Sequence, residues 1–222
     1  KPRLPEAIIL KLDFTKEVAE RAEQNPVMLA LGKTGDVSLK DAISAIDLAA
    51  KDERVKVVVG HFRENSVSMA AAQELRDAVH RFREQDKASY AFATSFGEFG
   101  AADKAYYLAS SFDNIWLQPM GLVGITGLAA QSPFIRGALD KIGAKADFVH
   151  REEYKSAMDM LTENDFTDAN AEMLNSILDD LNMQMVGDIA QERGLEPIGL
   201  MRLIDVAPIN ASTAYKEKLV TH

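Results

Sequence analysis

The residue best suited to acid–base chemistry in this sequence is Lys155, in the run Tyr154-Lys155-Ser156. It follows an apolar stretch, residues 146–150, that predicts a buried strand, and it precedes the apolar pair Ala157-Met158. A lysine held away from water is driven towards its neutral amine, which can take a proton from a serine hydroxyl. The alternative from the residues alone is an exposed lysine at the start of a helix. Ser156 is not expected to be the partner, because adjacent residues on an ordered backbone seldom direct their side chains at one another.

The other reactive side chains form no catalytic pattern. Neighbouring carboxylates such as Asp179-Asp180 and Glu152-Glu153 cannot face each other across a substrate, so we interpret them as solvated surface. The sequence has no Gly-x-Ser-x-Gly motif and no cysteine, and its four histidines are too far apart for a metal site. Glycine recurs every third residue over positions 121–127, which matches no dinucleotide or phosphate loop and suits closely packed backbone. We therefore predict no cofactor and no metal.

Composition narrows the function further. A formal charge of −9 argues against a nucleic-acid partner, because phosphate binding needs clustered Lys and Arg. No apolar run approaches the roughly 20 residues of a membrane-spanning helix. With 47% hydrophobic and 27% charged residues, the 222-residue chain resembles an ordinary globular protein with a real core. The first residue is Lys1 rather than methionine, which suggests a processed or cut fragment.

Strands and helices alternate along the first half of the sequence. Four short apolar runs predict strands, at residues 7–13, 55–60, 88–94 and 114–118. Apolar residues at helical spacing predict helices between them, at residues 38–51, 67–84 and 101–111. This alternation indicates right-handed crossovers and a mostly parallel sheet covered by helices. The predicted class is therefore α/β, and one domain over residues 1–222 is the simplest division.

The second half is predicted to be mainly helical. A helix over residues 131–142 leads to the strand at 146–150, and a long helix then begins after Thr167 and ends at Gly194. Short helices are predicted at residues 198–205 and 211–218. The long helix spans about 40 Å. That is more than one small sheet needs, so we expect part of it to contact something beyond this domain.

Several motifs in order give the chain a resemblance to a known family. They are Asp52-Glu53-Arg54 followed by Val-Lys-Val-Val-Val, Ala105-Tyr106-Tyr107-Leu108-Ala109-Ser110, Asp113-Asn114-Ile115-Trp116-Leu117, Leu139-Asp140-Lys141-Ile142, Tyr154-Lys155-Ser156-Ala157 and Lys218-Leu219-Val220. In this order they resemble the amino-terminal half of the long-form signal peptide peptidase A family, also called protease IV. The resemblance covers nearly the whole chain from Ala7 and implies a fold similar to crotonases and Clp protease subunits.

The resemblance also implies how the chemistry is divided. In that family the first half supplies a general-base lysine in a Tyr-Lys-Ser motif and the second half supplies the nucleophilic serine. Lys155 would be the base, with Tyr154 and Ser156 in support and no nucleophile in this chain. The place of a serine nucleophile reads Ala102-Asp103, and residues 61–66 stand where an active half has a glycine-rich oxyanion loop.

The expected protein is then a serine peptidase that degrades cleaved signal peptides by a Ser-Lys dyad. The serine-bearing half is absent from this chain, so the chain alone is expected to be inactive. The resemblance further implies apolar peptide substrates, a homo-oligomer such as a tetramer, and a periplasm-facing place at the bacterial inner membrane, with the anchor outside this chain.

Two other functions stay open. One is a non-catalytic assembly domain in which Lys155 is incidental and the long helix serves oligomerisation. The other is a crotonase-type acyl-CoA hydratase or isomerase, which needs an oxyanion pair and catalytic carboxylates that the sequence does not place.

Overall fold

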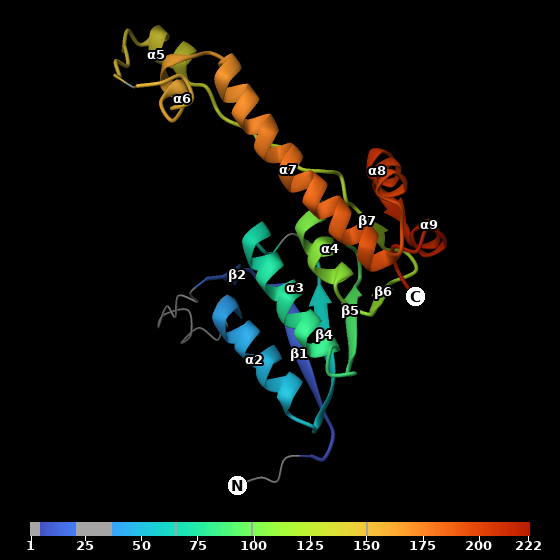
Figure 1. Cartoon of the computed structure of the whole chain (residues 1–222). Helices are drawn as coiled ribbons and strands as arrows, with labels where there is room; N and C mark the ends of the chain where they lie inside the picture. Colours follow the sequence, from blue (N-terminus) through green and yellow to red (C-terminus); the bar gives the residue numbers. More distant parts are fainter. Residues whose placement is uncertain (1–4, 21–36, 65, 99, 150) are drawn as a thin grey trace. The chain divides into compact units, whose positions relative to one another are not determined.

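The computed structural model describes residues 5–20, 37–64, 66–98, 100–149 and 151–222 (Figure 1). The chain divides into two compact units. The first joins Lys1–Gly127 to Val186–His222, and the second is Leu128–Met185. That the whole chain is one domain stays a prediction.

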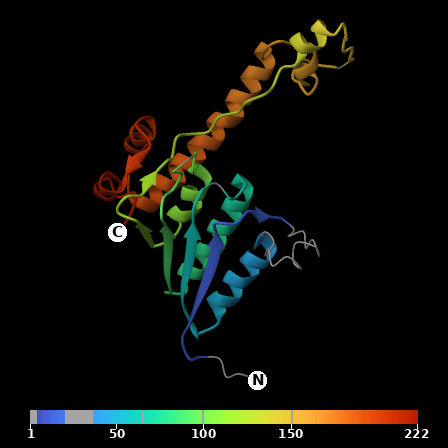
Figure 2. The ribbon, with the colours of Figure 1, turned by 180° about the vertical axis from the view of Figure 1, so that it is seen from behind.

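The first unit is built on a sheet of four parallel strands in the order β1-β4-β5-β6. Helices α2, α3 and α4 connect successive strands and lie against one face of this sheet (Figures 1 and 2). The strands are β1 Ile8–Phe14, β4 Val55–Phe62, β5 Ala88–Ala93 and β6 Asn114–Leu117, and the helices are α2 Leu39–Lys51, α3 Met69–Arg83 and α4 Asp103–Ser110. The parallel sheet with helical crossovers confirms the predicted α/β class and is compatible with the crotonase and Clp-protease type of fold.

Side chains of the strands alternate, and one set forms the core beneath the helices. In β4, Val58, Gly60 and Phe62 are buried, while Val59 and His61 between them are partly exposed. The Phe62 ring packs against Phe14 at 5.0 Å and edge-on to Phe112 at 5.7 Å between centroids. Burying one such side chain contributes about 1.5–3 kcal/mol, so this cluster fixes how the strands and helices meet.

Serine side chains set the starts of two helices. The Ser38 hydroxyl accepts a hydrogen bond from the Asp41 amide at the start of α2, and the Ser68 hydroxyl accepts one from the Ala71 amide at the start of α3. These bonds satisfy amides that a helix leaves without partners.

The glycines at positions 121–127 are structural, as predicted. A Cβ on Gly121 would lie 2.3 Å from the carbonyl oxygen of Thr94, and Gly127 has a φ of +87°. Between them the Gly124 amide donates to the Phe96 carbonyl at 2.7 Å. The backbone here packs too closely, and turns too sharply, for larger residues.

Helix α7, Asp168–Arg193, contributes to both units. Its predicted start is confirmed, because the Thr167 hydroxyl accepts from the Asn170 amide at 3.3 Å. Its predicted end is also confirmed, because Gly194 follows with a φ of +61°, the left-handed conformation of a helix C-terminal glycine. The second unit adds α5 Arg136–Lys141 and α6 Asp159–Thr162.

Two predictions for the second unit are wrong. The helix expected over 131–142 is limited to Arg136–Lys141. The strand expected over 146–150 does not form at residues 146–149, and His150 lies outside the described residues. Val149 is 99% exposed and Phe148 44% exposed there, so the apolar side chains that suggested a strand are not buried by the described residues. The edge of the sheet beside β6 pairs instead with the chain end, where the Thr221 amide donates to the Ile115 carbonyl at 2.8 Å.

Short elements complete the first unit. They are the parallel pair β2 Val18–Ala19 and β3 Val37–Ser38, the antiparallel pair β7 Leu122–Val123 and β8 Ile209–Asn210, and the helices α8 Pro197–Asp205 and α9 Ala211–Lys216. Among the helices described here, none has the length and apolar character needed to cross a membrane.

Candidate active site

Lys155 lies in the second unit, on a turn before α6, and its side chain is exposed. Its amide donates weakly to the Glu152 carbonyl at 3.4 Å, and Glu152 has a φ of +68°. The lysine side chain makes no ion pair or hydrogen bond with the residues that the structure describes. The predicted desolvation of Lys155 is therefore wrong for this chain alone. It depended on a buried strand before the motif, and that strand does not form.

Tyr154 ties the turn to helix α7. Its hydroxyl donates to Glu172 Oε2 at 3.1 Å. This hydrogen bond to a carboxylate raises the pKa of the Tyr154 hydroxyl, so the phenol stays protonated and keeps donating. Since both side chains are exposed, the bond restrains the turn more than it stabilises the fold.

Ser156 begins the connection to α6. Its carbonyl accepts from the Asp159 amide at 3.0 Å, and its side chain is half-buried at the wall of a pocket. The two neighbours of Lys155 thus hold the turn from either side. Neither is an ion-pair partner of the lysine.

The start of α4, where the resemblance places a serine nucleophile, holds Ala102 and Asp103. Asp103 is 1% exposed, and its Oδ1 accepts from the Gly127 amide at 2.8 Å. Burial raises the pKa of this carboxyl, and backbone amides bonded to it partly offset the change. Asp103 is thus a structural carboxyl that holds the Gly127 turn, and this position offers no hydroxyl to attack a carbonyl.

The loop after β4 is also bonded into the fold. The Ser66 hydroxyl donates to the Phe14 carbonyl at 2.5 Å, and the Ser66 carbonyl accepts from the Val18 amide at 2.8 Å. Arg63, Glu64 and Ser68 line a polar cleft of about 560 Å³ beside it. That this part of the chain supplies no oxyanion loop stays a prediction.

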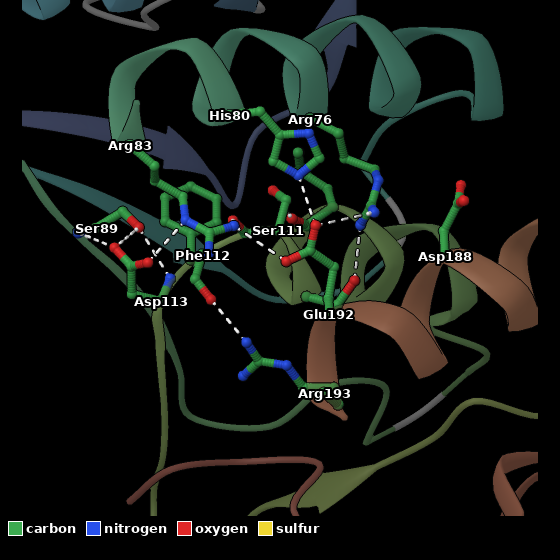
Figure 3. Close-up of polar contacts among 12 residues, drawn as sticks. Arg76, His80, Arg83, Ser89, Ser111, Phe112, Asp113, Asp188, Glu192 and Arg193 are labelled. Carbon is green, nitrogen blue, oxygen red and sulfur yellow. Dashed lines mark hydrogen bonds and ion pairs between the residues drawn. The ribbon is translucent and has the colours of Figure 1, made fainter. Parts of the chain in front are cut away.

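A second polar cluster lies in the first unit, between α3 and the carboxyl end of α7 (Figure 3). Glu192 of α7 meets His80 Nε2 at 2.7 Å, Arg83 Nη1 at 3.0 Å and Arg76 Nη2 at 3.8 Å. Burial alone raises the pKa of Glu192, but the hydrogen bonds with His80 and Arg83 outweigh it and lower the pKa to about 2. Next to it, Arg193 Nη2 donates to the Phe112 carbonyl at 3.0 Å.

Sequence reasoning missed this cluster. Its signal was present, because positions 76, 80 and 83 are all cationic or potentially cationic and share one face of a helix. Their partner lies more than a hundred residues away, however, and only the fold brings Glu192 to them. The cluster anchors the end of α7. Its carboxylate and its cationic side chains are bonded to one another.

No group of acidic or histidine side chains that could hold a metal ion occurs within the described part of the chain.

Comparisons with known proteins point to one family. The model for peptidase family S49 matches residues 81–222, a segment that includes Lys155. The chain is 23% identical over 198 residues to Protease 4 of Salmonella typhi, covering 85% of this chain and 31% of that protein. It is 28% identical over 141 residues to Protease 4 of Haemophilus influenzae, covering 62% and 22%, and 25% identical over 146 residues to the chloroplastic serine protease SPPA of Arabidopsis thaliana, covering 66% and 21%. The chain thus spans between about a fifth and a third of the length of these relatives.

Proposed function

Because the chain belongs to peptidase family S49, we propose that it is the lysine-bearing half of a serine peptidase that works through a Ser-Lys dyad. Lys155 is the general base, and the nucleophilic serine lies on a second domain of the same protein. The observation that carries the proposal is the presentation of Lys155: an amine without an ion-pair partner in the described chain, on a turn held by Tyr154 and Ser156.

The nucleophile is assigned elsewhere because the start of α4 offers none. Ala102 has no reactive side chain, and the Asp103 carboxyl is buried against the Gly127 amide. Docking of the serine-bearing domain over the exposed turn would remove Lys155 from water. Desolvation favours the neutral amine, which is the form that can accept a proton.

The reaction is acyl transfer in two steps. Neutral Lys155 takes the proton from the serine hydroxyl as its oxygen attacks the peptide carbonyl. The tetrahedral intermediate then collapses, the C–N bond breaks, and the Lys155 ammonium gives the proton to the leaving amine. In the second step Lys155 takes a proton from water, the hydroxide attacks the acyl ester, and the proton returns to the serine oxygen.

The substrates in this proposal are cleaved signal peptides or other apolar peptides. The protein faces the periplasm at the bacterial inner membrane and works as a homo-oligomer. The Arabidopsis thaliana relative is chloroplastic, so a similar protein also works in a different compartment in a plant.

The test uses the complete gene product and a fluorogenic apolar peptide. Lys155→Arg keeps the positive charge, but a guanidinium stays protonated and cannot act as a general base. The kcat should therefore fall about 10²- to 10⁴-fold. Lys145→Arg, an exposed lysine of the same unit, is the matched control and should cleave normally. The 222-residue chain alone should show no turnover. Full activity of Lys155→Arg would refute the assignment.

The exposure of Lys155 also favours one competing function, a non-catalytic assembly domain. An amine that stays in water throughout remains a cation at neutral pH and cannot act as a base. The two functions differ in the gene: a dyad peptidase requires a second α/β domain that carries a serine nucleophile. A complete protein without that domain, which nevertheless forms stable oligomers, would support assembly instead.

A further inference from the structure

A pocket of about 560 Å³ lies in the first unit, where the carboxyl end of α7 meets the last residues of the chain. This volume is within the roughly 300–1,000 Å³ of sites that hold small ligands. The described residues that line the pocket are Asp113, Glu192, Arg193, Tyr215, Lys216, Lys218, Val220 and Thr221. Three of these side chains are cations and two are carboxylates. What the pocket can bind depends on which of these charges already have a partner.

Both carboxylates of the pocket are paired with arginines of α3. Glu192 meets Arg83 Nη1 at 3.0 Å and Arg76 Nη2 at 3.8 Å. Asp113 meets Arg83 Nε at 2.7 Å and also accepts a hydrogen bond from the Ser89 hydroxyl at 2.7 Å. Two carboxylates thus face two guanidinium groups, and these opposite charges balance one another. The charge that remains on the pocket wall is positive.

The three cations on that wall have no such partner. Neither Arg193, Lys216 nor Lys218 forms an ion pair with another residue in the described parts of the chain. The Arg193 guanidinium donates through Nη2 to the Phe112 carbonyl (Figure 3), while its Nε is buried and has no hydrogen-bond partner among the described residues. Burial lowers the pKa of this guanidinium, because the nearby charges do not fully replace the water that it loses.

Lys218 occupies a position where helices commonly have glycine. It follows α9 with a φ of +61°, and the Leu219 amide donates back to the Ala214 carbonyl at 2.8 Å. This is the left-handed ending of a helix, in which glycine is more favourable than a residue with a Cβ. The backbone here therefore does not require a lysine, and the lysine side chain adds a positive charge to the pocket.

Hydrogen bonds hold the end of the chain in place around the pocket. The Tyr106 hydroxyl donates to the Leu219 carbonyl at 2.6 Å. The Thr221 hydroxyl donates to the Ile115 carbonyl at 3.0 Å and accepts from the Ile115 amide at 2.9 Å. Because this wall is formed before anything binds, little conformational entropy is lost on binding.

We propose that this pocket binds a phosphate monoester, either a small soluble ester or the headgroup of phosphatidic acid. Such a group carries about 1.5–2 negative charges at neutral pH and three acceptor oxygens. Arg193 offers planar donors to these oxygens, and Lys216 and Lys218 offer ammonium charges. The whole chain has a formal charge of −9, so its overall field repels an anion and binding depends on these three cations. The proposal is independent of Lys155 and of the dyad.

The experiment is a calorimetric titration of the 222-residue chain with glycerol 3-phosphate. It should show one site with a dissociation constant below about 1 mM. Lys216→Gln and Lys218→Gly should each weaken binding about 10-fold, because each removes one charge-assisted contact. Lys51→Gln, which changes an exposed lysine of the first unit outside the pocket, is the matched control and should bind like the wild type.

Lys218→Gly has a second readout that separates binding from folding. Because glycine favours the left-handed backbone at this position, the variant should melt at the temperature of the wild type or above it. Affinity and stability should therefore not fall together, as they would if the lysine only supported the fold.

Vesicles identify the source of the phosphate. Cosedimentation with phosphatidic acid vesicles but not with phosphatidylcholine vesicles, lost in Lys218→Gly, would support the lipid headgroup. Binding of glycerol 3-phosphate without cosedimentation would support a soluble ester. The proposal would be overturned if neither probe bound saturably, or if Lys51→Gln weakened binding as much as the two pocket variants do.

Discussion

Glu192→Gln should destabilise the first unit by about 3 kcal/mol at neutral pH. Glu192 is the only carboxylate that the described structure places against all three of Arg76, His80 and Arg83, and its side chain is 15% exposed. Arg76 itself is 4% exposed and stacks over the Tyr107 ring at 4.3 Å. Removing the negative charge leaves the buried Arg76 guanidinium without its carboxylate, whereas Arg83 keeps its ion pair with Asp113 at 2.7 Å. Breaking a buried ion pair typically costs about 3–5 kcal/mol, and the cost here is expected at the lower end of that range.

The pKa of Glu192 gives an independent magnitude and a pH dependence. The folded pKa of about 2 lies below the ordinary value of 4.5. A depressed carboxyl pKa means that the stabilisation is fully present above about pH 4.5 and is lost as the pH falls through about 2. At about 1.4 kcal/mol per pKa unit the contribution is about 3 kcal/mol. The free energy of unfolding of the wild type should fall between these two pH values as Glu192 is protonated. Glu192→Gln should lack this part of the fall.

The single tryptophan makes this measurable. Trp116 lies in the first unit, edge-on to Tyr90 at 5.7 Å, so its fluorescence reports unfolding of that unit. Urea unfolding would be followed by fluorescence and by far-UV circular dichroism at pH 7 and at pH 3. Glu196→Gln, the same chemical change at an exposed position, is the control and should alter the free energy of unfolding by less than about 0.5 kcal/mol. The electrostatic account would be refuted if both variants lost the same free energy of unfolding. It would also be refuted if Glu192→Gln lost as much stability between pH 7 and pH 3 as the wild type does.

Three further predictions concern single positions. Gly121→Ala should lower the free energy of unfolding by about 2 kcal/mol or more, because the added Cβ would lie 2.3 Å from the Thr94 carbonyl oxygen. Gly187→Ala should raise it by about 0.5–1 kcal/mol, because the position is helical and has open space around it. Urea titration measures both changes. Lys87→Met should lower it by about 1–2 kcal/mol in the same assay, because the ammonium donates to three carbonyls at the carboxyl end of α2. Tyr154→Phe should change the free energy of unfolding by less than about 0.5 kcal/mol, because the hydrogen bond to Glu172 is exposed. It should lower the kcat of the complete protein several-fold, because that bond restrains the lysine turn. Steady-state kinetics measures kcat, and a melting curve measures stability.

Local signals in the sequence were enough for the elements of the sheet. The β-branched run that begins at Val55 predicts a strand because those residues fit a buried pleated surface, and β4 forms there. The hydroxyl of Ser38 and the left-handed residue Gly194 mark helix ends because each satisfies backbone groups within a few residues. These interactions act over short distances along the chain, so their sequence patterns carry the information.

The strand expected at residues 146–149 shows where such signals stop. A short apolar run indicates that its side chains favour burial. A strand also needs a neighbouring strand whose backbone pairs with its own. Residues 146–149 have no strand partner among the described residues of the second unit, and no local pattern records whether a partner will be present. The same limit explains Glu192, whose three partners lie on a helix more than a hundred residues earlier.

No strand forms at residues 146–149 and Lys155 is exposed. This exposure adds a condition to the proposed mechanism. Burial by a preceding strand would have made the lysine a base within this chain, independent of any partner. The side chain is instead exposed on an open turn, and a general base is favoured only where a lysine is removed from water. A dyad built on Lys155 must therefore be switched on by whatever covers the turn. In the proposed dyad, the general-base role of Lys155 therefore depends on contact with the serine-bearing domain.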